Sequence, residues 1–218
     1  MHMKNIMPMK TIPLFTLCLF MLGACTPEAN RENLTQGMND YLSKHGNLCL
    51  AKQNWPIEIT PADFGAGTRD AVQMPVLQKL WLVSVSDVSV KTKDGNKTSV
   101  TMIKRYQLTE DGKKYYLTRE SDIPASSDGK HSPKGDLCVA QLTLDKIVAW
   151  EPLTDNNALK ETLVTYTYNV KAATWLQDPD AKRVFPMIDR VVQGAHVAQL
   201  KEAFVLSKNG WVAKAWHN

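Results

Sequence analysis

The sequence predicts an α+β protein in which about three helices pack on a mainly antiparallel β-sheet, as one domain or two small lobes. Two observations support this class: some stretches repeat apolar residues at helical spacing, and others alternate apolar and polar residues. Asp-Gly and Asn-Gly pairs, which favour tight hairpin turns, separate several of the alternating stretches. Hydrophobic residues make up 44% of the 218 residues, which is enough to build a core.

The first helix is expected at residues 31–45. Leu34, Met38, Tyr41, Leu42 and His45 recur there at helical spacing, and Gly46 follows as a stop signal. These five side chains should lie on one face of the helix.

Residues 55–81 are expected to contain a short extended piece, a loop and a second helix. The extended piece covers residues 55–59, and the stretch 61–67, which contains Pro and Gly, is typical of a loop. The helix should run over residues 70–81, with Pro75 either in its first turn or kinking it. The side chains expected to face the core are Val72, Val76, Leu77 and Leu80.

From residue 83 the pattern changes to period two, which predicts strands. Residues 83–90 form the first strand, and residues 100–108 return after a turn at residues 94–96. A second turn at residues 111–112 leads to a short strand at 115–117, so that these strands form two linked hairpins or a meander. Further strands are expected at 137–150 and 163–175, and a final hairpin joins 200–206 to 211–216 around Asn209-Gly210.

Two remaining segments complete this expectation. Residues 121–135, rich in Ser, Gly, Pro and Asp, should be the longest loop and a hinge or lid. A third helix should start at Asp178, which can cap it, with Pro179 at the first helical position. It should end before Gly194, with a kink at Pro186.

The N-terminus carries a motif of a different kind. Lys4 and Lys10 precede an apolar run at residues 12–22, and Leu22-Gly23-Ala24-Cys25 follows directly. The run of 11 residues is much shorter than the roughly 20 that a membrane-spanning helix needs. The whole segment resembles the signal peptide and lipobox of bacterial lipoproteins, which are cut before a lipid-modified cysteine. An ordinary secretory signal is the alternative interpretation.

The lipoprotein resemblance implies a domain plan and a location. Residues 1–24 would be the signal peptide, residues 25–33 a lipidated tether, and residues 34–218 a periplasmic domain with possible lobes at 34–120 and 136–218. Cys25 would carry the lipid, whose acyl chains anchor the protein to the membrane. Because Thr26 rather than Asp follows the cysteine, the resemblance implies the outer membrane, facing the periplasm.

The charge balance does not suggest a nucleic-acid partner. The chain has 26 Lys and Arg residues against 22 Asp and Glu residues. Without the first 24 residues, which contain Lys4 and Lys10 but no acidic side chain, the net charge is only +2. A nucleic-acid-binding protein normally carries a larger basic excess.

The cysteines fall into two groups by position. Cys18 lies in the signal segment and Cys25 in the lipobox. Cys49 and Cys138 remain as an even pair in apolar surroundings and in an oxidising compartment, so we expect a disulfide between them. Two separate buried thiols are the alternative.

A basic segment is the main candidate contact surface. Residues 91–119 contain eight basic side chains against three acidic ones. This surface would meet an anionic envelope component, such as lipid head groups, or an acidic partner protein. Alternatively, the lysines protect exposed strand edges from pairing with other chains. The candidate residues are Lys91, Lys93, Lys97, Lys104, Arg105, Lys113 and Lys114.

No catalytic or metal-binding pattern stands out. The histidines His45, His131, His196 and His217 are scattered, and neither a paired Cys motif nor a nucleophile motif is present. We therefore expect no metal, no cofactor and no catalytic residue. The six tryptophans could stack on sugars in a glycan groove, but we expect them mainly to finish the core.

The wider pattern is similar to small envelope lipoproteins of Gram-negative bacteria. It joins the Leu48–Pro56 region, Leu137-Cys138, residues 164–168, Phe185-Pro186-Met187 and Asn209-Gly210-Trp211. The resemblance implies location and a coherent fold but no catalytic residues. We expect a non-enzymatic binding or accessory module for an envelope partner, with an immunity-type protein as one form of it. The alternatives are an envelope hydrolase acting on peptidoglycan or glycan, and a lipid-binding protein.

Overall fold

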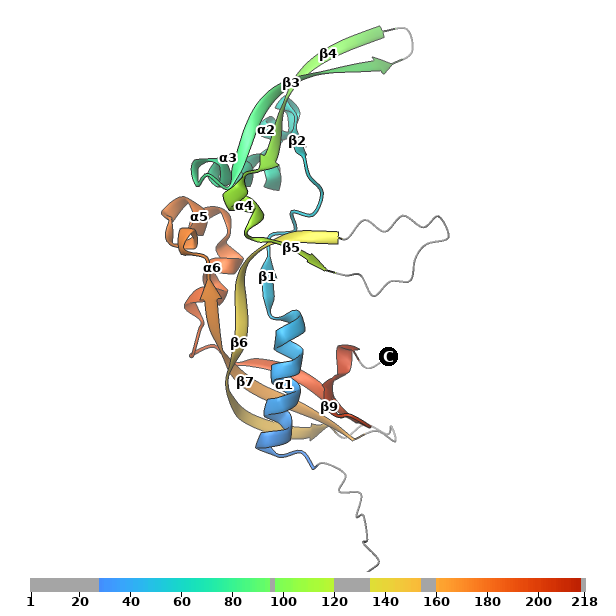
Figure 1. Cartoon of the computed structure of the whole chain (residues 1–218), viewed down its shortest axis with the longest axis vertical. Coiled ribbons are helices and arrows are strands. Elements are labelled where there is room, and N and C mark those ends of the chain that lie inside the picture. The colour runs from blue at the N-terminus through green and yellow to red at the C-terminus, as the bar shows by residue number, and fades with distance from the viewer. Residues whose placement is uncertain (1–27, 95–96, 120–133, 154–159, 217–218) are drawn as a thin grey trace, which may run out of the picture.

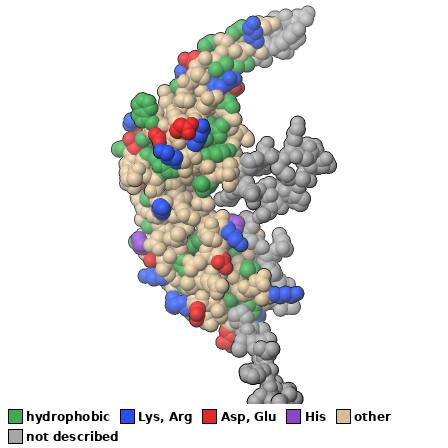
Figure 2. Space-filling model, viewed as in Figure 1, with side chains coloured by type: hydrophobic (Ala, Val, Ile, Leu, Met, Phe, Trp, Pro, Cys, Tyr) green, Lys and Arg blue, Asp and Glu red, His purple; other side chains and the backbone are tan. Residues whose placement is uncertain are grey.

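The computed structural model describes residues 28–94, 97–119, 134–153 and 160–216, which form an elongated crescent (Figures 1 and 2). The fold is α+β with antiparallel strand pairs, as the sequence predicts. A large six-stranded sheet has the order β1-β6-β7-β8-β9, with β5 paired to β6, and a small sheet has the order β2-β4-β3. The large sheet contains β1 (Asn47–Cys49), β5 (Tyr116–Arg119), β6 (Lys134–Leu153), β7 (Glu161–Ala172), β8 (Leu200–Ser207) and β9 (Gly210–Ala213). The small sheet contains β2 (Ile57–Ile59), β3 (Val83–Asp94) and β4 (Lys97–Leu108).

The first helix, α1 (Arg31–His45), lies across the large sheet, against β6 and β9 (Figure 1). Asn30 caps it by accepting a hydrogen bond from the backbone of Asn33, and the helix ends at Gly46. Of the five expected side chains, Leu34, Met38 and Leu42 are buried, whereas Tyr41 and His45 are only partly buried. The prediction of this helix is therefore confirmed in its bounds.

The stretch expected to be a loop at residues 61–67 is instead a short helix, α2 (Pro61–Ala66). Thr60 and Asp63 form a capping box, Pro61 occupies the first turn, and Gly67 ends the helix in the left-handed conformation. Each of these signals is visible in the sequence, but the helix is too short to show an apolar period. The loop prediction was wrong for this reason.

The next helix, α3 (Arg69–Lys79), confirms the second predicted helix but changes its buried face. Val72, expected in the core, is 44% exposed, because the buried stripe starts one residue earlier, at Ala71. Pro75 lies inside the helix beyond its first turn. The buried side chains of α3 are Ala71, Met74, Val76 and Leu77.

The expected meander after β4 is replaced by a crossing between the sheets. The predicted turn at residues 111–112 is a short helix, α4 (Glu110–Lys113), capped by Thr109. Gly112 packs so closely on the carbonyl of Leu82 that an added Cβ would lie 2.0 Å from its oxygen. After α4 the chain leaves the small sheet, and β5 pairs with β6 of the large sheet rather than with β4.

Pro186 divides the expected third helix into two. After a 3-10 turn, η1 (Thr174–Gln177), come α5 (Pro179–Val184) and α6 (Pro186–Gln193), with Phe185 in non-helical geometry between them. Pro186 has no N–H to continue the hydrogen-bond ladder of α5, so the break is complete rather than a kink. Asp178 caps α5 and Gly194 follows α6, as predicted. A last 3-10 turn, η2 (Lys214–Trp216), follows β9.

The long strand β6 passes through both hydrophobic clusters of the core. One cluster joins α3 and α5 to the base of the small sheet and to Leu137 of β6. The other lies between α1 and the large sheet and includes Leu142 and Ile147 of β6. Leu48 and Val170 pack against both clusters, which links them along the crescent.

The expected disulfide is present between Cys49 of β1 and Cys138 of β6. The two residues lie directly opposite each other in the antiparallel pairing of these strands. The bond therefore fixes the segment that follows α1 to the strand that runs through both clusters.

Candidate functional site

A two-stranded arm projects from one end of the molecule (Figure 1). β2 pairs with β4 only at Lys104–Tyr106. Beyond these residues, β3 and β4 pair with each other and with no other described strand. We call residues 87–94 of β3 and 97–103 of β4 the hairpin arm. The first described residues of the chain lie at the opposite end of the crescent.

One face of the hairpin arm combines apolar and basic side chains. Val100 and Met102 are 60% and 53% exposed, although both are apolar. The strand register places Lys91 opposite Val100 and Ser89 opposite Met102, so these four side chains share one face. The opposite face carries Ile103, which is buried. Exposed apolar side chains beside a lysine are typical of a contact surface.

Most of the predicted basic residues are already paired with carboxylates. Lys104 donates to Asp87 at 3.0 Å, and Arg105 donates to Glu58. Because Lys104 and Arg105 are consecutive in β4, they lie on opposite faces of the small sheet. The hydrogen bond from Lys104 to Asp87 raises the pKa of the lysine.

The other predicted basic residues lie apart from this pair. Lys113 is the last residue of α4 and Lys114 follows it, and each pairs with the carboxylate three residues earlier, Glu110 and Asp111. The hydrogen bond to Asp111 raises the pKa of Lys114. Lys91 is exposed and has no ion-pair partner among the described side chains. The side chains of Lys93 and Lys97 lie outside the described part of the structure.

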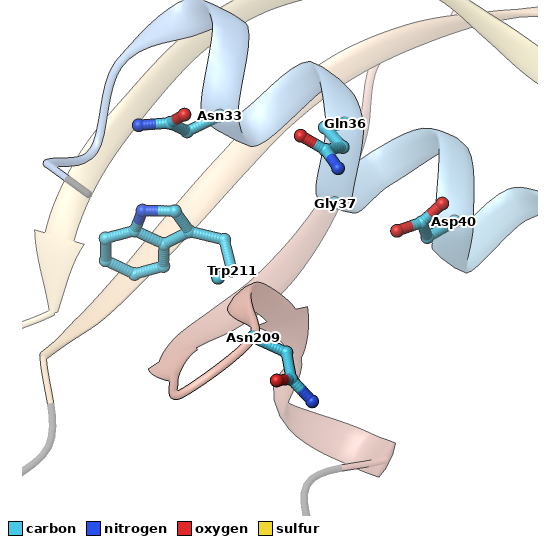
Figure 3. Close-up of a pocket in the computed structure, with 7 residues that line it drawn as sticks. Asn33, Gln36, Gly37, Asp40, Asn209 and Trp211 are labelled. Carbon is cyan, nitrogen blue, oxygen red and sulfur yellow. The ribbon is translucent and has the colours of Figure 1, made fainter. Parts of the chain in front are cut away.

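A narrow pocket lies where α1 meets the turn between β8 and β9 (Figure 3). Its volume is about 40 Å³, which is room for water but not for a sugar. The ring of Trp211 lies beneath α1, is only 6% exposed, and donates from Nε1 to the carbonyl of Glu28. Trp211 therefore completes the core and cannot stack on a glycan. The lining residues are Asn33, Gln36, Gly37, Asp40, Asn209, Gly210 and Trp211.

The same cleft widens toward the C-terminal end of α1. There a hollow of about 300 Å³ is bounded by Tyr41, Lys44 and His45 of α1 and by Val212. His45 packs on the ring of Tyr41 at 5.4 Å. Burial, and then the nearby Glu202 carboxylate, raise the pKa of Tyr41. The hydroxyl of Tyr41 therefore stays protonated at neutral pH and can serve as a hydrogen-bond donor.

The remaining tryptophans differ in their surroundings. Trp55, Trp150 and Trp175 are partly buried, and Arg31 lies over the ring of Trp150 at 5.7 Å. Trp81 contradicts the expectation of core packing, because it is 79% exposed at the corner between α3 and β3. Its φ of 62° turns the chain into β3 and directs the side chain outward. The side chain of Trp216 lies outside the described residues.

The histidines are not gathered into one site. His131 and His217 lie outside the described residues, and His45 belongs to the α1 cleft. His196 has its Nδ1 3.6 Å from a carboxylate oxygen of Asp145. A hydrogen bond from Thr167, and then His196, lower the pKa of Asp145. Within the part of the chain that is described, no group of His, Cys, Asp and Glu residues is arranged to hold a metal ion.

A buried lysine gives no signal in the sequence. Lys52 is 1% exposed, its Nζ donates to Asp70 of α3, and its backbone N–H donates to Asp136 of β6 at 2.7 Å. The adjoining hollow of about 360 Å³ is lined by charged and polar side chains that include Glu58, Asp70 and Arg69. Nothing in its local sequence distinguishes Lys52 from an exposed lysine. The contact holds the connection between β1 and β2 against α3.

No protein-family model, curated protein or solved structure matches this chain. Cys25 and the rest of the lipobox lie outside the described residues. Among the helices of the described ranges, none has both the length and the apolar character to cross a membrane. The candidate sites therefore stand on geometry alone.

Proposed function

We propose that this protein is a lipoprotein of the Gram-negative envelope, anchored through Cys25 in the outer membrane and facing the periplasm. It acts there as a non-enzymatic binding module for an envelope partner, of which an immunity-type protein is one form. The proposal combines the lipobox-like N-terminus with the position of the hairpin arm.

The observation that carries the proposal is the separation of the N-terminal end from the hairpin arm (Figure 1). Arg31, where α1 begins, is six positions after Cys25, and a fully extended chain over this interval spans only about 20 Å. A lipid on Cys25 would therefore keep the α1 end close to the membrane. The hairpin arm would then lie at the end of the crescent far from the anchor, where a partner can reach it.

The chemistry of the arm indicates the kind of partner. Val100 and Met102 offer exposed apolar surface, and Lys91 adds a positive charge on the same face. A complementary surface would present apolar side chains beside a carboxylate, since like charges would oppose the contact. We therefore propose an acidic, partly apolar protein surface as the partner.

Site-specific photocrosslinking tests the proposed contact surface. A photoreactive amino acid at Met102 in the full-length protein, in its own membrane, should capture one dominant envelope protein. The same amino acid at Lys208, which is exposed between β8 and β9, serves as the matched control. Equal capture from both positions, or none from Met102, would contradict the role of the arm.

The anchor is tested independently by Cys25→Ala. The variant should lose acylation and leave the membrane fraction, while the wild-type protein stays in it. Mass spectrometry of the wild-type N-terminus should show an acylated cysteine at position 25. An unmodified Cys25, or unchanged membrane fractionation of the variant, would contradict the lipoprotein assignment.

A further inference from the structure

The outer edge of β3 is open. In the small sheet, β4 lies between β2 and β3, so β3 is an end strand over its whole length from Val83 to Asp94. None of the described strands pairs with its outer side. A long exposed edge is a template on which another strand can pair.

The hydrogen bonds of the sheet identify which backbone groups face this edge. The N–H of Thr109 donates to the carbonyl of Leu82 at 3.1 Å, so Val83 and Leu108 form a non-hydrogen-bonded pair. The register then runs without a shift to the pair of Asp94 and Lys97. Every second residue from Val83 therefore directs its N–H and C=O away from β4. Beyond Val83, these outward residues are Val85, Asp87, Ser89, Lys91 and Lys93.

We propose that this edge pairs with the same edge of a second copy of the chain, antiparallel and about a two-fold axis at Ser89. In such an interface, a surface on one copy contacts the identical surface on the other copy. Backbone hydrogen bonds form across the interface only where outward residues of one copy lie opposite outward residues of the other. A register centred on Ser89 meets this condition. It opposes Val85 to Lys93 and Asp87 to Lys91 of the second copy, which gives about ten backbone hydrogen bonds.

The side-chain charges favour this register. Asp87 and Lys91 are four residues apart on the same face of β3. In the proposed pairing each Asp87 lies directly opposite Lys91 of the second copy, and the two-fold axis makes this contact twice. Asp87 already accepts from Lys104 of its own chain, so its carboxylate would lie between two ammonium groups. Lys91, which has no ion-pair partner among the described side chains, would gain one.

A lysine on an edge strand can also prevent pairing. Lysine prevents pairing in a register that places Lys91 opposite Lys91 of the second copy, because like charges that face each other across two strands destabilise the pair. Centring on Ser89 replaces that repulsion with two attractive contacts. The positions of Asp87 and Lys91 therefore select one register rather than exclude all of them.

The two-fold axis has a consequence for the arrangement of the copies. The two arms run past each other in opposite directions, so the N-terminal ends lie on opposite sides of the paired strands. On a single membrane, both copies would lie along the surface rather than stand upright on it. The pairing itself does not depend on the lipid anchor.

The pairing can be tested with two charge reversals. Asp87→Lys opposes two lysines, and Lys91→Asp opposes two aspartates, so each variant alone should dissociate at least about tenfold more readily than the wild type. In an equimolar mixture one contact joins the introduced lysine to the introduced aspartate and the other joins the native Lys91 to the native Asp87, so the dimer should return. Sedimentation of the full-length protein in detergent measures all four samples, and circular dichroism checks that each variant is folded.

A crosslink provides a second, independent readout. Ser89→Cys should form a disulfide-linked dimer under mild oxidation, since the two copies of this residue meet at the axis. Ser43→Cys, exposed on α1, should not. A wild-type protein that stays monomeric, a mixture that fails to regain the dimer, or equal crosslinking at both positions would overturn the proposal.

Discussion

The Nζ of Lys52, a side chain that is 1% exposed, donates a hydrogen bond to the carboxylate of Asp70 at the start of α3. The side chain of Asp70 itself is 44% exposed, so the two charges of this pair differ in their access to water. The pair joins the connection between β1 and β2 to the helix that packs under the small sheet. Its asymmetry makes the effect of removing either partner predictable.

Asp70→Asn should destabilise the protein more than Lys52→Met. The first change leaves an uncompensated ammonium group in the interior, whereas the second leaves a carboxylate that water can solvate. We expect a loss of about 3 kcal/mol in the free energy of unfolding for Asp70→Asn and about 1 kcal/mol for Lys52→Met. Chemical denaturation measures both. Equal losses, or a larger loss for Lys52→Met, would contradict the asymmetry.

Removal of the disulfide should also lower stability. Cys49 and Cys138 are 89 residues apart, and a crosslink over so long a loop restricts the unfolded chain by about 4 kcal/mol. The double variant Cys49→Ala/Cys138→Ala should therefore unfold at much lower denaturant concentration than the wild type. In the wild type, thiol labelling of unfolded protein should increase only after reduction. Labelling of residues 49 and 138 without reductant would show that the bond does not form.

The sequence was informative where a single local signal decides the structure. The periodicity of Leu34, Met38 and Leu42 predicts α1 within its observed bounds, and the cysteine pairing follows from position alone. The failures occur where tertiary packing decides. After β4, Gly112 packs against the carbonyl of Leu82 and β5 pairs with β6 of the large sheet, and no local pattern reveals these contacts.

The candidate sites show the same contrast between what local sequence indicates and what only tertiary packing decides. Composition identifies residues 91–119 as basic, but the carboxylates that pair with Lys104 and Arg105 come from β3 and β2, which only the fold brings together. The burial of Lys52 has no sequence signal either. The outward-facing groups of β3 depend on strand register, which can be established only with the structure in hand.

The acidity of Asp145 should depend more on Thr167 than on His196. The hydrogen bond from Thr167, at 2.7 Å, is the largest cause of the lowered pKa, and the contact with His196 is weaker. A carboxyl group whose pKa is lowered by folding stabilises the protein above its unfolded pKa of about 3.9 and loses that contribution as the pH falls through the folded pKa. Carboxyl NMR titration should therefore show a higher pKa for Asp145 in Thr167→Val than in His196→Gln. The reverse order would show that His196 dominates.

Gly37 is expected to be essential for the packing of α1 on β9. An added Cβ would lie 2.4 Å from the backbone oxygen of Trp211, and a backbone atom cannot move aside as a flexible side chain can. Gly37→Ala should therefore shift the helix and reduce the free energy of unfolding by about 1–3 kcal/mol, although alanine favours helices.

The matched control for this change is Gly65→Ala in α2, where an added Cβ meets no atom within 4 Å. That variant should be neutral or more stable by up to about 1 kcal/mol, because only helix propensity changes. Thermal and chemical unfolding of the two variants measure the difference. If Gly37→Ala were as stable as Gly65→Ala, α1 would not approach β9 as closely as the fold requires.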